Sequence, residues 1–182
     1  MSEPDDDARV LFFAIDARPP GALDETLPEG YRLTVWHPTW RRWTPPALSG
    51  AKWLVWALLH YSGIFPGRRY AVVQIWHGGE LVHRSPVFPK YFRFPFMQSH
   101  DLQVGDTWTD ERERGRGLAV VGLRHAAAMA GAGGSRLWYV TTRANAASVR
   151  VAERAGLAQV GVGTRRNRFG LAVLGQYRIG ER

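Results

Sequence analysis

The sequence contains no cysteine among its 182 residues. This absence excludes disulfide bonds, thiolate metal ligands and a cysteine nucleophile. Helical His-x-x-x-His pairs, a frequent arrangement of zinc ligands, are missing as well, so we expect no metal site. Such a chain must obtain its stability from an apolar core, and its hydrophobic content of 45% is ordinary for a globular protein.

Long apolar runs are also absent. No segment approaches the roughly 20 residues needed to cross a bilayer. The N-terminus, MSEPDDDAR, is acidic where a secretory signal would be basic and then apolar. We therefore expect a cytoplasmic protein without a membrane partner. Residues 1–8 are expected to be disordered, and residues 9–182 have the length of a single domain.

Acidic residues are scarce outside the first thirty positions. The formal net charge is +8, yet residues 1–30 hold eight acids against Arg9 and Arg18, so the remainder carries 22 basic and 8 acidic residues, or +14. A basic body of this kind suits an anionic ligand such as a nucleotide. Nucleic acid is the alternative partner. We do not favour it, because the basic residues are dispersed, form no run of five and belong to no nucleic-acid-binding motif.

The first half of the chain alternates between strand and helix patterns. Apolar or alternating runs predict strands at 10–15 and 31–36. A hairpin of 70–76 with 80–83 is predicted around His77-Gly78-Gly79. A periodic apolar stretch, preceded by two prolines and ended by Ser-Gly, predicts a helix over 47–61.

The segment 85–97 is rich in aromatic residues and proline. Pro86, Pro89 and Pro95 argue against a central strand, because proline cannot donate a ladder hydrogen bond. The aromatic side chains of this segment would either line a pocket or pack an irregular loop against the core.

The second half continues the mixture of strands and helices. Its patterns predict strands at 136–142, 158–162 and 171–179, a helix over 145–155 and a basic turn at 163–168. Strands and helices in this order indicate a mixed α/β fold, with a mostly antiparallel sheet flanked by helices.

The segment 101–119 carries the most specific chemical signal. An alternating strand pattern ends at Thr109, a charged turn follows, and a glycine-rich step opens a helical pattern at Leu118. Free backbone N–H groups at a helix start, together with the helix dipole, form a binding site for phosphate. Gly115 and Gly117 would allow a phosphate to approach the backbone closely. The pattern therefore predicts a phosphate cradle.

The segment 101–180 resembles the GNAT superfamily of acyl-CoA-dependent N-acyltransferases. The family's phosphate motif, Arg/Gln-x-x-Gly-x-Gly/Ala, is matched by Arg114-x-x-Gly117-x-Ala119 and by an overlapping frame that begins at Arg112. We favour the first frame, because it leaves Thr109 at the end of the strand and Leu118 on the buried face. Asn145-x-x-Ser148, followed by a helix that ends before Gly156-Leu157, resembles a second family segment, with leucine in place of phenylalanine.

The resemblance implies the GNAT fold, with a splayed central strand pair, and transfer of an acetyl group from acetyl-CoA to a primary amine by direct attack in a ternary complex. The strand 104–109 is similar to members linked to amino-sugar and polysaccharide pathways, so a small molecule or amino sugar is the favoured acceptor. Asn145-x-x-Ser148 is also similar to the branch that acetylates ribosomal proteins. A longer acyl-CoA or acyl-carrier donor, a protein N-terminus as acceptor, and a non-catalytic CoA-binding module are the alternatives. A homodimer is compatible with exposed sheet edges.

The resemblance also implies which residues contact acetyl-CoA. The strand backbone beside the splay would pair with pantetheine and polarise the acetyl carbonyl, the glycine-rich turn would hold the pyrophosphate, and the second helix start would reach the pantetheine arm. These contacts fall on Thr107, Trp108, Thr109, Arg114, Gly115, Arg116, Gly117, Leu118, Ala119, Asn145 and Ser148.

Proton transfer is the step for which the resemblance helps least. Many family members protonate the leaving thiolate with a helix tyrosine, and this chain has Ala152 at that position. Tyr139, Tyr177 or water would have to replace it. The candidates for the base are carboxylate or imidazole groups near the splay, namely Asp106, His83 and His100. We select Asp106, Tyr177 and His100 as the catalytic candidates, although each is also a residue type that commonly packs or caps.

Overall fold

The computed structural model describes residues 9–16, 27–168 and 171–180. In this part of the chain, nine strands form one sheet in the order β2-β3-β4-β5-β7-β1-β8-β9, and β6 pairs with β4. The strands are β1 (Val10–Ile15), β2 (Tyr31–Trp36), β3 (Ala71–His77), β4 (Glu80–Pro89), β5 (Leu102–Val104), β6 (Trp108–Thr109), β7 (Leu137–Thr142), β8 (Ala158–Arg168) and β9 (Leu171–Gly180). The pairing is antiparallel except between β5 and β7, which confirms the predicted mixed fold with a mostly antiparallel sheet.

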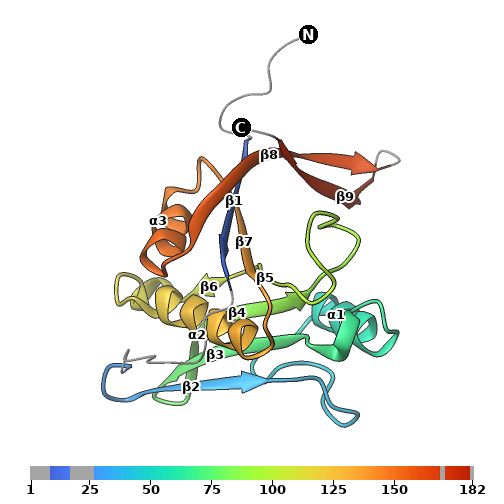
Figure 1. Ribbon diagram of the computed structural model, residues 1–182. Coiled ribbons are helices and arrows are strands. Elements are labelled where there is room, and N and C mark those ends of the chain that lie inside the picture. The colour runs from blue at the N-terminus through green and yellow to red at the C-terminus, as the bar shows by residue number, and fades with distance from the viewer. Residues whose placement is uncertain (1–8, 17–26, 169–170, 181–182) are drawn as a thin grey trace.

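Three α-helices accompany the sheet: α1 (Ala51–Tyr61), α2 (Leu118–Ala132) and α3 (Ala146–Arg154). Two short 3-10 turns, η2 (Pro66–Arg68) and η3 (Glu111–Glu113), precede β3 and α2. Figure 1 shows the β8–β9 hairpin extending beyond the helices. In the described residues, no helix has the length and apolar character needed to span a membrane. The expectation that residues 1–8 are disordered lies outside the described residues.

The helices α1 and α2 cover opposite faces of the sheet. Gly122 of α2 packs on His83 and Ser85 of β4, where an added Cβ would lie 2.4 Å from the His83 Nε2 atom. Alternation along a strand points Arg84 to the other face, and there its guanidinium lies 5.4 Å from the ring of Trp53 in α1. The two faces of β4 therefore belong to two different layers.

The N-terminal strand β1 lies deep in the sheet. It pairs antiparallel with both β7 and β8, although both follow it by more than a hundred residues. Phe12 and Phe13 are 0% and 1% exposed. A strand covered on both faces reads as a continuous apolar run, and the run at 10–15 predicted this strand correctly.

The prediction that proline excludes residues 85–97 from a central strand is wrong for residues 85–89. Strand β4 runs through Pro86 to Pro89 and pairs with β3, β5 and β6. The Pro86 carbonyl accepts a hydrogen bond from Gly105 N–H, so the side of Pro86 that lacks an N–H faces the break between β5 and β6. Proline is tolerated at this point because the ladder is already interrupted.

Two other boundaries differ from the prediction. Helix α1 begins at Ala51 and not at residue 47, because Ala47 and Gly50 have φ angles of +59° and +110°, which no α-helix accommodates. The predicted basic turn at 163–168 is instead the second half of β8, which extends to Arg168 and pairs with β9. Arginine on an exposed hairpin does not oppose strand formation.

The segment that links β5 to β6 breaks the regular pairing. Val104 is the last residue of β5 to pair with β7, opposite Tyr139. Asp106 then takes a φ of +52°, and β6 turns away to pair with β4, with Arg84 opposite Trp108. The strands β6 and β7 consequently diverge after Val104. This divergence is the splayed central pair that was expected.

Candidate functional site

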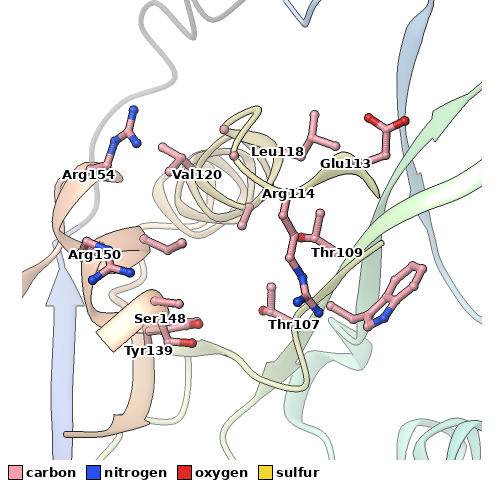
Figure 2. Close-up of a pocket in the computed structure, with 16 residues that line it drawn as sticks. Thr107, Thr109, Glu113, Arg114, Leu118, Val120, Tyr139, Ser148, Arg150 and Arg154 are labelled. Carbon is pink, nitrogen blue, oxygen red and sulfur yellow. The ribbon is translucent and has the colours of Figure 1, made fainter. Parts of the chain in front are cut away.

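A pocket of about 470 Å³ lies where β6 and β7 diverge. Its walls come from β6, the turn between η3 and α2, β7 and α3, as Figure 2 shows. The structure places most of the predicted ligand-binding residues on these walls. They are Thr107, Trp108, Thr109, Arg114, Gly115, Gly117, Leu118, Ala119 and Ser148. Thr107 and Ser148, which are 41 positions apart in the chain, thus meet around one cavity.

The turn before α2 presents a row of backbone donors. Gly115 and Gly117 have φ angles of +81° and +79°, a left-handed conformation that glycine adopts without strain. The N–H groups of Val120 and Val121 both donate to the Gly117 carbonyl. Within the described chain, the N–H groups of residues 115–119 have no hydrogen-bond acceptor. Five free donors at the positive end of a helix dipole are the arrangement that the predicted phosphate cradle requires.

Open space lies beside both glycines. An added Cβ at Gly115 or Gly117 would meet no protein atom within 4 Å. The glycines are therefore needed for their backbone conformation, and no protein group occupies the volume next to them. Leu118, at the first position of α2, is 1% exposed, as the favoured frame of the motif requires.

Glu113 anchors this turn to the antiparallel pair of β2 and β3. Its Oε2 accepts a hydrogen bond from the Tyr31 hydroxyl at 2.5 Å, and its Oε1 lies 3.2 Å from His77 Nδ1. The Tyr31 ring stacks on the His77 ring, with 4.2 Å between centroids. The hydrogen bond from Tyr31 is the main cause that lowers the pKa of Glu113. The Nε of Arg116 lies 3.1 Å from the same carboxylate, and Arg116 is not among the residues that line the pocket.

Searches against family models and against curated proteins found no match. Solved structures do match. A GCN5-related N-acetyltransferase from Sphaerobacter thermophilus superposes with a TM-score of 0.57 at 16% identity, over 85% of this chain and 49% of that one. A GNAT-family acetyltransferase from Colwellia psychrerythraea superposes with a TM-score of 0.55 at 18% identity, over 84% of this chain and 53% of that one. A tandem GNAT protein from the clavulanic acid biosynthesis pathway superposes with a TM-score of 0.53 at 14% identity, over 85% of this chain and 51% of that one.

The chain has the GNAT fold. It spans about half the length of each of these three neighbours. At such identities the likeness concerns the fold, so the chemistry has to be inferred from the residues at the site.

Tyr139 is the tyrosine that reaches the pocket. It comes from β7, is 6% exposed and lines the cavity beside Ser148, with Thr107 on the facing wall (Figure 2). Burial raises the pKa of Tyr139, and hydrogen bonds with Ser148 and Thr107 act in the opposite direction. Ala152, where many GNAT members carry a tyrosine, is 0% exposed inside the core. The phenol available to this pocket therefore comes from the sheet and not from α3.

The three predicted catalytic residues do not meet at the pocket. The Oδ2 atom of Asp106 lies 2.8 Å from Lys52 Nζ, toward α1. Tyr177 stacks on Phe94, with 5.2 Å between parallel rings. His100 precedes β5, at the end of that strand remote from Thr107. In the described structure none of the three lines the cavity.

The His83 side chain lies behind the pocket wall, between β4 and β6. It is 0% exposed, and its two ring nitrogens lie 2.8 Å from the Thr109 hydroxyl and 2.9 Å from the Ser85 hydroxyl. Burial, with a contribution from the neighbouring Arg84, lowers the pKa of His83 to about 3. A neutral imidazole between two hydroxyls links β4 to β6, so we assign it a structural role.

Asn145 caps α3, as predicted. Its Oδ1 accepts a hydrogen bond from Ser148 N–H at 3.1 Å. The Asn145 side chain is exposed and is not among the residues that line the pocket. The neighbouring Ser148 lines it instead.

Two arginines that we did not predict also line the pocket. Arg150 and Arg154 lie on α3 opposite the turn that carries Arg114 (Figure 2). No carboxylate partner of Arg150 or Arg154 is found in the described residues, whereas Arg114 lies 3.3 Å from Glu111. Their spacing of four residues puts both on one helix face. The sequence does show this spacing, but it identifies the two arginines as ligand-binding candidates only if α3 is known to face the cradle.

No group of three or more His, Cys, Asp or Glu side chains that could hold a metal ion occurs in the part of the chain that is described. The cationic and backbone donors at the pocket fit an anionic organic ligand better than a metal ion.

Proposed function

We propose that this chain is an N-acetyltransferase that moves an acetyl group from acetyl-CoA to a primary amine. The observation that supports this proposal best is the row of acceptor-free N–H groups at 115–119, because four of these five residues line the cavity beside the diverging strands. Backbone donors at a helix start suit a pyrophosphate. The gap between β6 and β7 suits an extended arm that pairs with strand edges, as pantetheine does in the GNAT family.

The cationic side chains at the pocket extend this fit. Arg150 and Arg154 add two positive charges on the α3 wall. Coenzyme A carries a further phosphate on its ribose, which guanidinium groups bind well. Thr107 and Trp108 line the pocket on the side of β6, where Thr107 faces Tyr139. The thioester would therefore lie near the splay.

Direct attack in a ternary complex requires few groups from the protein. The amine nitrogen forms a bond to the thioester carbonyl carbon, the C–S bond breaks, and the thiolate receives a proton. Tyr139 is our choice as the proton donor, because its raised pKa keeps the phenol protonated at neutral pH. The amine proton passes to water, and water returns a proton to the Tyr139 phenolate, so the enzyme is restored. With no cysteine in the chain, an acyl-cysteine intermediate is excluded.

The acceptor would approach from the α1 side of the splay. Trp108, which lines the pocket, lies there with its ring 5.4 Å from the Arg84 guanidinium. An indole ring beside a cationic group favours an acceptor with a flat or sugar-like face. A small amine or an amino sugar is therefore the acceptor class that we propose.

The substitution Gly117→Glu tests the cradle. A carboxylate placed at the N-terminus of α2 would repel a pyrophosphate, so the affinity for acetyl-CoA should fall by at least about tenfold in calorimetry. Gly134→Glu is the matched control, because Gly134 has a φ of +64° and open space beside it but follows the other end of α2. Both variants carry a similar backbone cost of about 1–2 kcal/mol. Equal affinities in the two variants would reject the cradle.

Turnover is tested separately. Release of free CoA should be measured against a panel of amino sugars, amino acids and peptide N-termini. Tight acetyl-CoA binding without turnover on any amine would reject the proposed enzymatic activity and indicate a non-catalytic CoA-binding module.

A further inference from the structure

Exposed apolar side chains are concentrated on one part of the surface. Among the described residues, the exposed large apolar side chains within 40–64 are Trp40 (76%), Leu54 (50%), Val55 (50%), Leu58 (56%) and Ile64 (48%). Elsewhere only Phe92 and Val160 belong to this class, at 43% and 40%. Single exposed apolar residues are normal, but a contiguous patch indicates an interaction surface.

Most of these side chains lie on α1 or pack against its end. Leu54, Leu58 and Tyr61 are four and three residues apart, which aligns them on one helix face. The Trp40 ring stacks on Tyr61 with 4.7 Å between centroids, and Trp43 packs on the same ring at 5.2 Å. We call the surface formed by Trp40, Trp43, Leu54, Val55, Leu58 and Tyr61 the α1 face.

Helix α1 is apolar on both sides. Its inner side buries Trp53, Ala57 and His60 against the sheet. A helix on the surface of a water-soluble domain normally carries polar residues outside. Between Ala51 and Tyr61 the only charged residue is Lys52. The outer side of α1 therefore has the composition of a surface that is buried against a binding partner.

The charged residues of the segment that carries the α1 face are all basic, and Asp106, from the link between β5 and β6, pairs with Lys52 at 2.8 Å. Residues 30–79 contain no aspartate or glutamate, and their basic residues are Arg32, Arg41, Arg42, Lys52, Arg68 and Arg69. Arg41 and Arg42 lie between Trp40 and Trp43, and both are exposed. Indole rings next to guanidinium groups are typical of segments that lie in the headgroup region of a bilayer.

We propose that the α1 face binds the surface of an anionic lipid bilayer. Trp40, Leu54 and Leu58 would enter the boundary between headgroups and acyl chains, and Arg41 and Arg42 would contact lipid phosphates. This proposal revises the expectation of no membrane partner, which rested on the absence of a spanning segment. The α1 face contributes no residue to the pocket, so lipid binding does not depend on acetyl transfer.

A second copy of the chain fits the α1 face less well. A two-fold contact would bring the same patch of each copy together. Arg41 and Arg42 of both copies would then approach each other, and no acidic residue within 30–79 could compensate them. An anionic bilayer supplies the missing charge.

Sedimentation of the full chain with vesicles tests the proposal. The protein should pellet with vesicles of phosphatidylglycerol and phosphatidylcholine, remain in the supernatant with phosphatidylcholine alone, and release as salt is raised. The double variant Leu54→Ser/Leu58→Ser should weaken binding by at least about tenfold. The pair Arg41→Glu/Arg42→Glu should do the same, because each basic residue near the surface contributes about 1 kcal/mol.

Matched controls separate a specific face from general adhesion. Val160→Ser changes an exposed apolar residue on β8, and Arg178→Glu changes an exposed cation on β9; both should bind like the unmodified chain. Circular dichroism checks the fold of every variant, and substitutions at half-exposed positions should leave the melting temperature nearly unchanged.

Two results would overturn the proposal. The first is a negative sedimentation assay, in which the unmodified chain fails to pellet with anionic vesicles at low salt or all variants pellet equally. The second comes from analytical ultracentrifugation. A dimer that Leu58→Ser converts to a monomer would show that a second copy covers the α1 face. Neither result would affect acetyl-CoA binding, which is measured separately on the same samples.

Discussion

Burial acts in opposite directions on two ionisable side chains at the pocket wall, Tyr139 and His83. It raises the pKa of the Tyr139 phenol and lowers the pKa of the His83 imidazole. Both groups are consequently neutral at neutral pH. The difference lies in access, because Tyr139 lines the cavity while His83 is enclosed by Thr109, Ser85 and α2. A neutral phenol with access to the pocket can donate a proton, and an enclosed imidazole can only hold the wall in place.

Tyr139→Phe tests the proposed donor. If the phenol protonates the thiolate, kcat should fall by about a hundredfold while acetyl-CoA affinity changes little. Tyr177→Phe is the matched control, since Tyr177 stacks on Phe94 away from the cavity, and its kcat should be unchanged. An unaltered kcat in Tyr139→Phe would assign proton delivery to water.

The imidazole makes a separate prediction about stability against pH. An unfolded histidine has a pKa near 6.5, whereas burial lowers that of folded His83 to about 3. Between these values the unfolded chain binds a proton that the folded chain does not. His83 therefore makes the free energy of unfolding fall as pH drops below about 6.5, by up to about 1.4 kcal/mol per unit. Urea titrations should show a shallower pH dependence for His83→Gln than for the unmodified chain.

At the scale of elements, the turn between η3 and α2 combines two opposed requirements. Its backbone N–H groups must stay free for a ligand, and the turn must nevertheless be held in one conformation. Glu113 meets the second requirement from outside, through Tyr31 on β2 and His77 at the end of β3. A rigid donor row loses less entropy when it binds an anion.

Glu113→Gln should loosen this turn. The affinity for acetyl-CoA is expected to fall by roughly three- to tenfold, because Tyr31 and Arg116 lose a charged partner while the donors themselves remain. Glu111→Gln is the control. The Glu111 side chain, which pairs with Arg114, is 82% exposed, and such exposed ion pairs contribute little to stability. If both variants bind alike, Glu113 does not position the cradle.

The same carboxylate predicts how binding depends on pH. The hydrogen bond from Tyr31 lowers the pKa of Glu113, so its anchoring is complete at neutral pH. It should be lost only when pH falls through a value below the usual glutamate range.

At the scale of the whole molecule, β1 connects the two parts of the sheet. It lies between β7, which lines the pocket, and β8, which leads to the outer hairpin. The contacts of β1 span most of the chain length. The position of the pocket wall thus depends on residues near the N-terminus that do not themselves line the pocket.

Phe13→Ala measures this dependence. Phe13 is 1% exposed in the core cluster that includes Tyr139, so its truncation should destabilise the fold by about 3–5 kcal/mol in urea titrations. Val160→Ala on β8, at 40% exposure, should change the free energy of unfolding by no more than about 0.5 kcal/mol. A loss below about 1 kcal/mol for Phe13→Ala would mean that β1 can leave the sheet without disrupting it.

Sequence patterns predicted correctly those elements that depend on a few adjacent residues. The apolar run at 10–15, the glycine turn of the β3–β4 hairpin and the Asn145 cap all follow from short stretches of chain, and all are present. Pro86 was misjudged because its tolerance depends on a break in a neighbouring strand. Helix α1 was extended too far because the backbone angles of Ala47 and Gly50 leave no mark on hydrophobic periodicity.

The same division applies to the site. The sequence alone determined the donor row, since Gly115, Gly117 and the start of α2 are contiguous and their backbone geometry is set within one turn. Tertiary structure alone decided which side chains face that row. It brought Tyr139, Arg150 and Arg154 to the pocket, and placed Asp106, Tyr177 and His100 outside it. The physical reason is that a helix cap depends on a few adjacent residues, whereas a pocket depends on strand register and on where two strands part.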